Sequence, residues 1–271
     1  MAIDASREVI TLEAPATVRP EHRSLPYLRA TSILALLVVW EIATWTRIVP
    51  PVFLPGPLTV ARELGRMATT GELWHNLGLS LGRIVVGFVI GSAAGLLVGV
   101  LAGVSDSAEA IVDPLVAATY PIPKIALLPL LILWLGIGET SKVAVIAIGA
   151  FFPVAIGTMS AVREVDPLLV RAARSLGATP YHIVTKVRIP ASLPVIFASL
   201  RLAAGMSLLL VVSAEMIAAT AGIGYLILYA GDLLQTSRLL AGIAVLSILG
   251  LASTTGLQAM ERRFLRGRHQ G

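Results

Sequence analysis

Long runs of apolar residues alternate along this chain with short polar stretches. Six of the runs approach or exceed the roughly 18–20 residues that a helix needs to cross a bilayer. They cover residues 28–46, 80–104, 111–135, 141–162, 193–219 and 239–260, and prolines interrupt the third run near residues 121–124. The pattern therefore predicts an all-α integral membrane protein with six transmembrane helices.

The polar stretch after the first run contains a separate helical signal. Pro57 is a favourable first helical residue, and Leu58, Ala61 and Leu64 then recur at helical spacing. This spacing predicts a short amphipathic helix that lies at the outer membrane interface or against the bundle.

Composition agrees with a membrane protein. Of the 271 residues, 56% are hydrophobic and only 14% are charged, whereas a soluble domain has roughly 25% charged residues. The absence of cysteine excludes disulfides, thiolate metal sites and cysteine nucleophiles. The net charge of +5 could indicate a nucleic-acid partner, but basic residues beside membrane spans explain it better, and we expect no nucleic-acid partner.

The basic residues indicate the orientation. Of the 21 Lys and Arg, four lie at or before residue 29, four lie at or after residue 262, and six lie in or beside the loop between the fourth and fifth spans. The loop group comprises Arg163, Arg171, Arg174, Lys186, Arg188 and Arg201. The positive-inside rule then predicts that this loop and both termini are cytoplasmic. We expect residues 1–27 to be a disordered cytoplasmic tail, residues 28–266 the transmembrane domain, and residues 267–271 a short cytoplasmic tail.

The cytoplasmic loop has its own start and stop signals. Asp166 followed by proline is a strong helix start, and Gly177 suits a left-handed helix end. Thr179 followed by proline repeats the start signal, and Pro190 is expected to stop the second helix. Residues 166–190 are therefore predicted to form a hairpin of two short helices.

The composition of this hairpin suggests a partner. One face of its first helix is apolar, with Leu168, Leu169, Ala172, Ala173 and Leu176. Its basic residues indicate an acidic or polar cytosolic partner, and the small alanine pair permits close approach. The alternative is an ordinary loop between spans with some interfacial helix.

This region resembles the cytoplasmic signature of bacterial ABC importer permeases, which reads Glu-Ala-Ala, three residues, Gly, nine residues, Ile-x-Leu-Pro. Ala172, Ala173 and Gly177 match the first part, and the stretch from Val187 to Pro190 matches the end at the correct distance. Two positions depart from the signature, because Arg171 replaces the glutamate and Ile189 replaces the leucine.

The resemblance extends over residues 28–266. Residues 121–154, 214–227 and 256–264 are similar to the corresponding regions of nitrate/sulfonate/taurine-type permeases. It implies a type I importer fold, a second permease copy, two cytosolic ABC ATPase subunits and an extracytoplasmic substrate-binding protein in a bacterial inner membrane. It also implies that the hairpin couples to the ATPase through Arg171, Ala172, Ala173, Gly177, Val187, Ile189 and Pro190.

The chain is not expected to hydrolyse ATP or to hold a cofactor. It has no G-x-x-x-x-G-K-[ST] phosphate loop, and its four histidines include no pair at metal-ligand spacing. The resemblance implies transport of a small nutrient such as a sulfonate, taurine or nitrate. The alternatives are a permease for a vitamin precursor, phosphonate or metal ion, a passive channel, and an intramembrane enzyme.

Three polar residues in the spans are candidates for the substrate pathway. Tyr120 and Lys124 lie at the proline break of the third span, where irregular backbone is tolerated if it lines a cavity. Glu215 lies within the fifth span and must face protein or water. We favour a structural role for Glu215, because a carboxylate would repel an anion.

Glycines recur every four residues along the second span, from Gly87 to Gly103. Such a stripe permits close helix packing. We favour static packing within one subunit over a surface that slides during gating.

Overall fold

The computed structural model describes residues 26–46 and 49–266, and helices joined by turns and short connections make up this part of the chain. The predicted terminal tails therefore lie almost wholly outside the described residues. The helices in chain order are Pro26–Trp45 (α1), Pro57–Thr69 (α2), Glu72–Val104 (α3), Asp106–Thr119 (α4), the 3₁₀ turn Lys124–Leu127 (η1), Leu128–Leu135 (α5), Glu139–Arg163 (α6), Pro167–Ser175 (α7), Pro180–His182 (α8), the π-helical segment Ile183–Arg188 (η2), Ile189–Ala218 (α9), Ile223–Asp232 (α10) and Thr236–Arg266 (α11).

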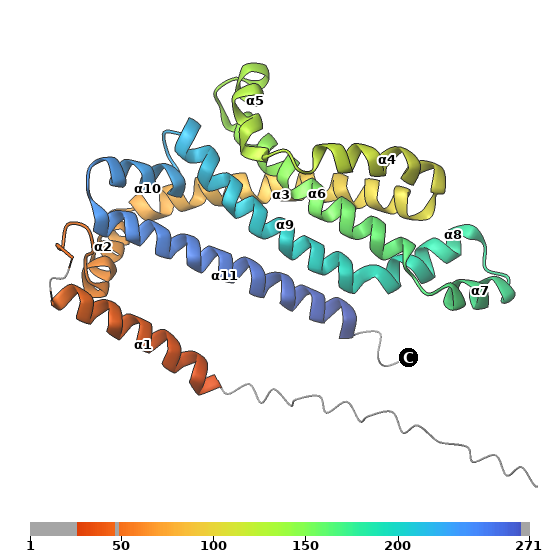
Figure 1. Cartoon of the computed structure of the whole chain (residues 1–271), viewed down its shortest axis with the longest axis horizontal. Coiled ribbons are helices and arrows are strands. Elements are labelled where there is room, and N and C mark those ends of the chain that lie inside the picture. Colours follow the sequence, from red (N-terminus) through yellow and green to blue (C-terminus); the bar gives the residue numbers. More distant parts are fainter. Residues whose placement is uncertain (1–25, 47–48, 267–271) are drawn as a thin grey trace, which may run out of the picture.

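The long helices α3, α6, α9 and α11 run alongside one another and form the bundle (Figure 1). Within the described residues, four stretches can each cross a membrane by length and hydropathy: α3, α6, the continuous helix Pro180–Ala218, and α11 up to Phe264. A fifth span is counted if α4 and the segment Lys124–Leu135 form one bent span. The apolar part of α1, Leu34–Trp45, is shorter than these spans. Six spans therefore stay a prediction, with α1 as the sixth.

The glycine stripe on α3 packs on α6 within the same chain. A Cβ atom added to Gly91 would lie 2.1 Å from the carbonyl oxygen of Ala147, and one added to Gly95 would lie 2.7 Å from that of Phe151. Only glycine allows the two backbones to approach this closely. The stripe therefore packs on a helix of the same subunit, whereas a contact that stays fixed during gating stays a prediction.

The third predicted span is broken where the prolines lie. α4 ends at Thr119, and the helical segment that resumes at Lys124 is inclined to it by 89°. Pro121 and Pro123 lack the amide hydrogens that a continuous helix would need there. The bend turns α5 away from α4, so that α5 projects from the bundle (Figure 1).

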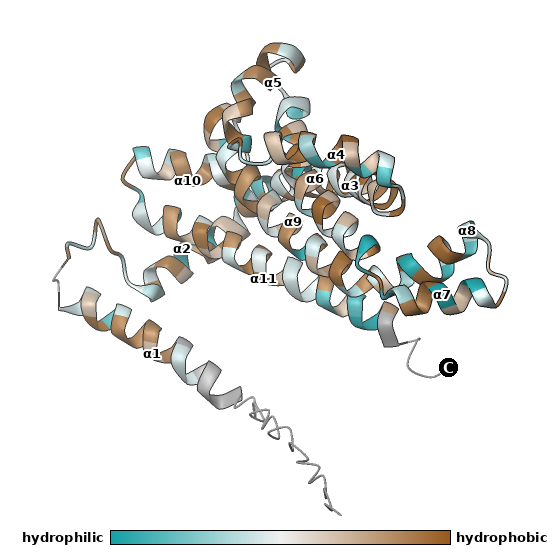
Figure 2. Ribbon diagram, turned by 45° about the vertical axis from the view of Figure 1, so that its right-hand side comes forward, coloured by the Kyte–Doolittle hydropathy of each residue, from teal (hydrophilic) through white to brown (hydrophobic). Residues whose placement is uncertain are grey.

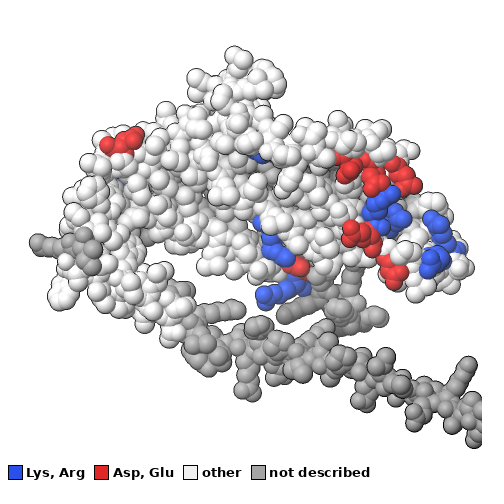
Figure 3. All heavy atoms as spheres, viewed as in Figure 1, with Lys and Arg blue, Asp and Glu red and all other residues white. Residues whose placement is uncertain are grey.

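The two ends of the bundle differ in character. α7 and α8 project at one end, which is also where α11 ends, whereas α2 and α10 lie at the other (Figure 1). Brown, apolar residues dominate the long helices, and teal residues gather on α7 and α8 (Figure 2). Most of the charge visible on one face lies at this projecting end (Figure 3).

The amphipathic helix near Pro57 forms as predicted, but with a different buried face. α2 buries Val60 and Met67 against α3, α10 and α11, while Leu58 is largely exposed. Leu58 and Ala61 border a shallow hollow beside α1 instead. Leu64 packs against the core cluster, so the helix lies against the bundle, which is one of the two predicted places, whereas Leu58 and Ala61 do not belong to the buried face.

Pro190 does not stop a helix, contrary to the prediction. It is the second residue of α9 and lies inside the continuous helix Pro180–Ala218, directly after a π-helical segment, where the shifted hydrogen-bond pattern accommodates a residue without an amide hydrogen. The chain enters this turn through the π-helical segment, in which the Ile189 amide donates to the Val184 carbonyl five residues earlier. The second arm of the hairpin therefore continues directly into the span α9.

Candidate functional site

The hairpin between α6 and α9 is shaped by the capping residues that the sequence singled out. The Asp166 carboxylate accepts a hydrogen bond from the Leu168 amide at 2.7 Å, which starts α7. Gly177 has a φ of +80°, and the next amide, of Ala178, donates back to the Ala173 carbonyl at 3.0 Å. The Thr179 hydroxyl accepts from the His182 amide at 3.3 Å and starts α8. The turn is thus fixed by local hydrogen bonds.

The tip of the hairpin exposes apolar side chains that the described residues leave uncovered. Leu176 is 88% exposed, and Leu168, Leu169 and Tyr181 are also exposed. Val170 and Ile183 point the other way and are buried. Arg171, Arg174 and Lys186 are exposed as well, so the tip combines leucines with positive charge.

The seven residues predicted to couple to an ATPase fall into two groups. Arg171, Ala172 and Gly177 are exposed at the tip, with Ala173 half-buried beside them. Val187, Ile189 and Pro190 are half-buried at the base, where the hairpin joins α9. The structure therefore brings the first four residues to one surface and places the last three in the joint beneath it.

The base of the hairpin is tied to the bundle. The Arg188 guanidinium donates to the Gly103 carbonyl at the end of α3, at 3.2 Å. The Ser192 hydroxyl donates to the Ala161 carbonyl near the end of α6, at 2.8 Å. Because the hairpin is also continuous with α9, it contacts three of the long helices.

Glu215 lies at the centre of a buried polar network at the opposite end of the bundle. Its carboxylate is fully buried and accepts hydrogen bonds from Arg83 at 2.6 Å and from Ser80 at 2.7 Å. It also accepts from the Gly224 amide in the first turn of α10, at 2.8 Å. A Cβ atom on Gly222 would lie 2.4 Å from the Glu215 carboxyl carbon, so the carboxylate fills the space that this glycine leaves.

Other side chains extend this network to α6 and to the start of α10. The Arg83 guanidinium donates two further hydrogen bonds to Glu139, which also pairs with Lys142 at 3.1 Å. The Asn76 side-chain oxygen accepts from the Gly222 amide, and the Ser80 hydroxyl accepts from the Ile223 amide, both at 2.8 Å. These contacts support the structural role that we favoured for Glu215.

Sequence reasoning missed the partners of Glu215. The available signal was the spacing of Asn76, Ser80 and Arg83, which recur at four and three residues and so share one helix face. A polar face inside an apolar run predicts a polar partner in the bundle.

Lys124, a predicted pathway residue, is bonded to the backbone at the proline break. It is 7% exposed, and its ammonium group donates to the carbonyl oxygens of Thr119, Tyr120 and Ile122 at 2.8–2.9 Å. It also lies 4.2 Å from the centre of the Phe152 ring. All three ammonium hydrogens are thus engaged at the end of α4, and the lysine stabilises the bend.

Tyr120 borders an open hollow of about 550 Å³ on the side of the bundle. One lining residue comes from α6, and a row of residues along one face of α9 forms most of the rest of the lining. The lining residues are Tyr120, Pro153, Arg201, Leu202, Gly205, Met206, Leu208 and Leu209. Arg201 was grouped with the cytoplasmic loop in the charge count, but it lies twelve residues inside α9.

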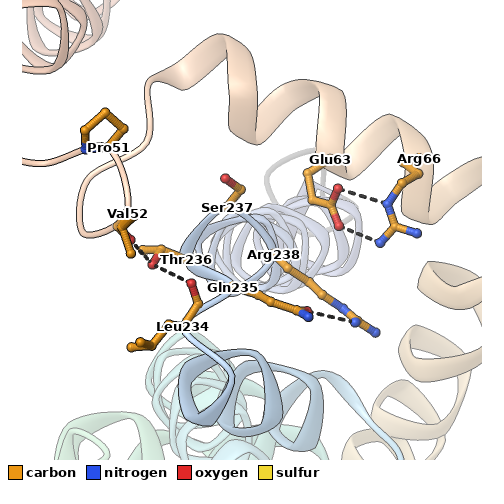
Figure 4. A pocket seen from close by; sticks show the side chains of 9 residues that line it. All are labelled: Pro51, Val52, Glu63, Arg66, Leu234, Gln235, Thr236, Ser237 and Arg238. Carbon is orange, nitrogen blue, oxygen red and sulfur yellow. Dashed lines mark hydrogen bonds and ion pairs between the residues drawn. The ribbon is translucent and has the colours of Figure 1, made fainter.

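A second hollow, of about 430 Å³, lies at the end of the bundle opposite the hairpin, between α2 and the turn before α11 (Figure 4). The Glu63 carboxylate and the Arg66 guanidinium on its wall form an ion pair at 2.5 Å. The hydrogen bond from Arg66 holds the pKa of the Glu63 carboxyl below its usual value. Arg238 on the facing wall pairs with Glu72.

Comparison with known proteins identifies the family. A family model described as "Binding-protein-dependent transport system inner membrane component" matches residues 91–266. The chain is 38% identical over 251 residues to the taurine transport system permease protein TauC of Escherichia coli (strain K12), an alignment that covers 90% of each protein. It is 33% identical to the putative aliphatic sulfonates transport permease protein SsuC of Bacillus subtilis (strain 168), over 93% of this chain and 91% of the relative.

A solved structure has the same fold. A chain of the MetNI methionine ABC transporter, in an inward-facing conformation, superposes with a TM-score of 0.56 at 23% identity, covering 71% of this chain and 94% of that chain. The chain therefore belongs to the inner-membrane component family of binding-protein-dependent transport systems, as an ABC importer permease of the nitrate/sulfonate/taurine type.

Proposed function

We propose that two copies of this chain form the membrane pathway for a small sulfonate, such as taurine or a short alkanesulfonate. Two cytosolic ATPase subunits supply the energy, and an extracytoplasmic binding protein delivers the substrate. The proposal for the substrate is supported by the taurine and aliphatic sulfonate relatives, which match over about nine-tenths of the chain.

The observation that carries the coupling role is the exposed hairpin. In a membrane protein without cytosolic partners, a capped hairpin that exposes Leu176 and its apolar neighbours to water would have no function that offsets this exposure. A cytosolic ATPase that covered these leucines would remove them from water and place acidic groups against Arg171 and Arg174. The coupling residues are accordingly Arg171, Ala172, Ala173 and Gly177 at the tip and Val187, Ile189 and Pro190 at the base.

The attachment of the hairpin supports its use as a lever. Its base is bonded to α3 and α6 and is continuous with α9. When the ATPase subunits close on ATP, displacement of the hairpin moves these helices together, which is the rigid-body type of transition. A flexible loop would absorb the displacement instead.

The orientation follows from the same assignment. If the hairpin is cytoplasmic, the end of α11 is cytoplasmic too, and the hollow beside Arg66 and Arg238 faces outward. We place the docking site of the binding protein at this outer end. For the pathway we retain Tyr120, which is exposed, whereas Lys124 and Glu215 are engaged in contacts within the chain.

The alternatives explain the structure less well. A passive channel has no need of an exposed apolar hairpin. An intramembrane enzyme needs accessible polar groups, whereas Glu215 and Lys124 are buried and bonded to protein groups.

The test is co-purification and uptake with the ATPase and binding protein encoded alongside this chain. We expect a complex with two permease copies and two ATPase copies, and ATP-dependent uptake of taurine or 1-butanesulfonate in proteoliposomes. In Gly177→Pro, proline cannot adopt the φ of +80°, so uptake should be lost while membrane insertion is retained. Normal uptake in this variant, or purification without any ATPase, would rule out the coupling role.

A further inference from the structure

The hollow beside Tyr120 contains a charge at membrane depth. Pro153 on its wall lies ten residues from the hairpin end of α6 and fourteen from the other end. At 1.5 Å per residue these separations correspond to about 15 Å and about 21 Å. The hollow is therefore near the middle of the bundle, and among the described residues that line it Arg201 alone is charged.

An arginine at this depth cannot face lipid without a large cost. The side chain of Arg201 is nevertheless 27% exposed within the single chain. This part of α9 must therefore face water or another protein surface in the assembled transporter, which is the environment of a translocation pathway.

The guanidinium of Arg201 is only partly used by its partner in the chain. Among the described residues it makes one hydrogen bond, from Nη1 to the Glu261 carboxylate on α11. A guanidinium carries five N–H donors in a planar fork, so donors are left for an incoming anion. The Tyr120 side chain borders the same space, and its hydroxyl makes no hydrogen bond within the described part of the chain.

The rest of the lining suits an aliphatic group. Leu202, Met206 and Leu209 present an apolar strip along α9. A Cβ atom on Gly205 would meet nothing within 4 Å, so the strip is open at this point. A small anion with a short hydrocarbon part could thus lie along the strip with its charged end at Arg201.

We propose that Arg201 and Tyr120 form a binding station for the sulfonate group of the transported solute. Arg201 donates to the sulfonate oxygens, Tyr120 donates its hydroxyl hydrogen, and the carbon chain lies along Leu202, Met206 and Leu209. Glu261 pairs with this guanidinium from α11 but does not line the hollow and takes no part in holding the solute. This inference rests on the proposed function, because it names the group that the pathway recognises.

The test compares the two partners of the ion pair in the reconstituted complex. Arg201→Gln removes the donors and should lower uptake of both 1-butanesulfonate and taurine by about tenfold to a hundredfold, the range for a lost hydrogen bond to a charged group. Glu261→Gln breaks the same ion pair but keeps the guanidinium, so uptake should stay within about threefold of the wild type. Arg201→Lys keeps the charge without the planar fork and should give an intermediate loss.

The exchanged variant R201E/E261R distinguishes sulfonate binding by Arg201 from a role of Arg201 in packing α9 on α11. It restores an ion pair between α9 and α11 but puts a carboxylate at the station, so uptake should remain low. Recovery of uptake in this variant, or equal losses in Arg201→Gln and Glu261→Gln, would show that Arg201 only joins the two helices and would overturn the station.

A binding measurement makes the test independent of transport. We expect 1-butanesulfonate to raise the melting temperature of the purified wild-type complex and of Glu261→Gln, but not of Arg201→Gln. An equal rise in all three would place the anion elsewhere, and no rise in any would also contradict the station. If the wild type binds the probe at Arg201 but transports no sulfonate, the proposed substrate is wrong while the anion station stands.

Discussion

Arg83 on α3 and Glu215 on α9 form a buried ion pair, with the Arg83 Nη1 atom 2.6 Å from the Glu215 Oε1 atom. The same carboxylate accepts the Gly224 amide, so one acidic group joins two spans to the first turn of α10. Removing one partner of such a pair leaves an uncompensated charge in the interior. A substitution of Glu215 is therefore expected to change the stability of the permease rather than its transport activity.

Glu215→Leu should destabilise the permease strongly. Loss of one partner of a buried pair costs roughly 3–5 kcal/mol, and the Gly224 amide loses its acceptor too. We expect a large fall in the melting temperature and in the yield of the purified complex. Glu139→Gln is the control, because the Glu139 side chain is 60% exposed and its loss should cost less. An unchanged melting temperature in Glu215→Leu with abolished uptake would instead indicate a pathway role.

Gly91→Ala tests the contact between α3 and α6. The new methyl group would meet the Ala147 carbonyl oxygen, a backbone atom that cannot move unless the helices separate. Overpacking of this kind costs typically about 1–3 kcal/mol. Gly82→Ala on the same helix is a matched control, since its Cβ atom would meet nothing within 4 Å. Thermal unfolding of the two variants in detergent should differ clearly, and equal melting temperatures would contradict the close packing.

Leu176→Ser tests the docking surface of the hairpin. Leu176 is 88% exposed, so its loss should leave the folded permease unchanged. If an ATPase covers it, the amount of ATPase that co-purifies should fall several-fold. Ile137, which is 81% exposed and lies between α5 and α6, provides the control Ile137→Ser. Retention of the ATPase by Leu176→Ser, or equal loss in both variants, would argue against docking at this tip.

Lys124→Met tests the bend between α4 and η1. The variant keeps an unbranched side chain, one atom shorter, but leaves three carbonyl oxygens without their donor. The three hydrogen bonds are partly buried, and a hydrogen bond to a charged group contributes about 1.5–3 kcal/mol, so the melting temperature should fall. Tyr120→Phe keeps the ring near the ammonium group and should unfold like the wild type. If Lys124→Met lost uptake at full stability, Lys124 would belong to the pathway instead.

Much of the fold could be predicted because its signals are local. Asp166, Gly177 and Thr179 act through hydrogen bonds to residues within a few positions, and the structure has the predicted caps. The break at residues 121–124 follows from proline chemistry. The length of the apolar runs likewise gives the long helices directly.

The functional details depend on contacts between distant segments, which the sequence does not specify. Ser80 and Glu215 are 135 residues apart, and Arg201 and Glu261 are 60 apart. The sequence showed that Glu215 needs a polar partner but could not name it. Pro190 was misread for a related reason, since the preceding π turn lets proline begin a span that is continuous with the hairpin.

The π-helical segment Ile183–Arg188 also sets the direction in which the hairpin points. One residue corresponds to about 100° of rotation around a helix axis. Deleting a single residue here would convert the wide turn into an ordinary one and swing α7 around α9 by roughly that angle. Leu168 and Leu176 would then point to another side of the bundle. The number of residues in this short stretch therefore sets the direction in which the docking surface faces.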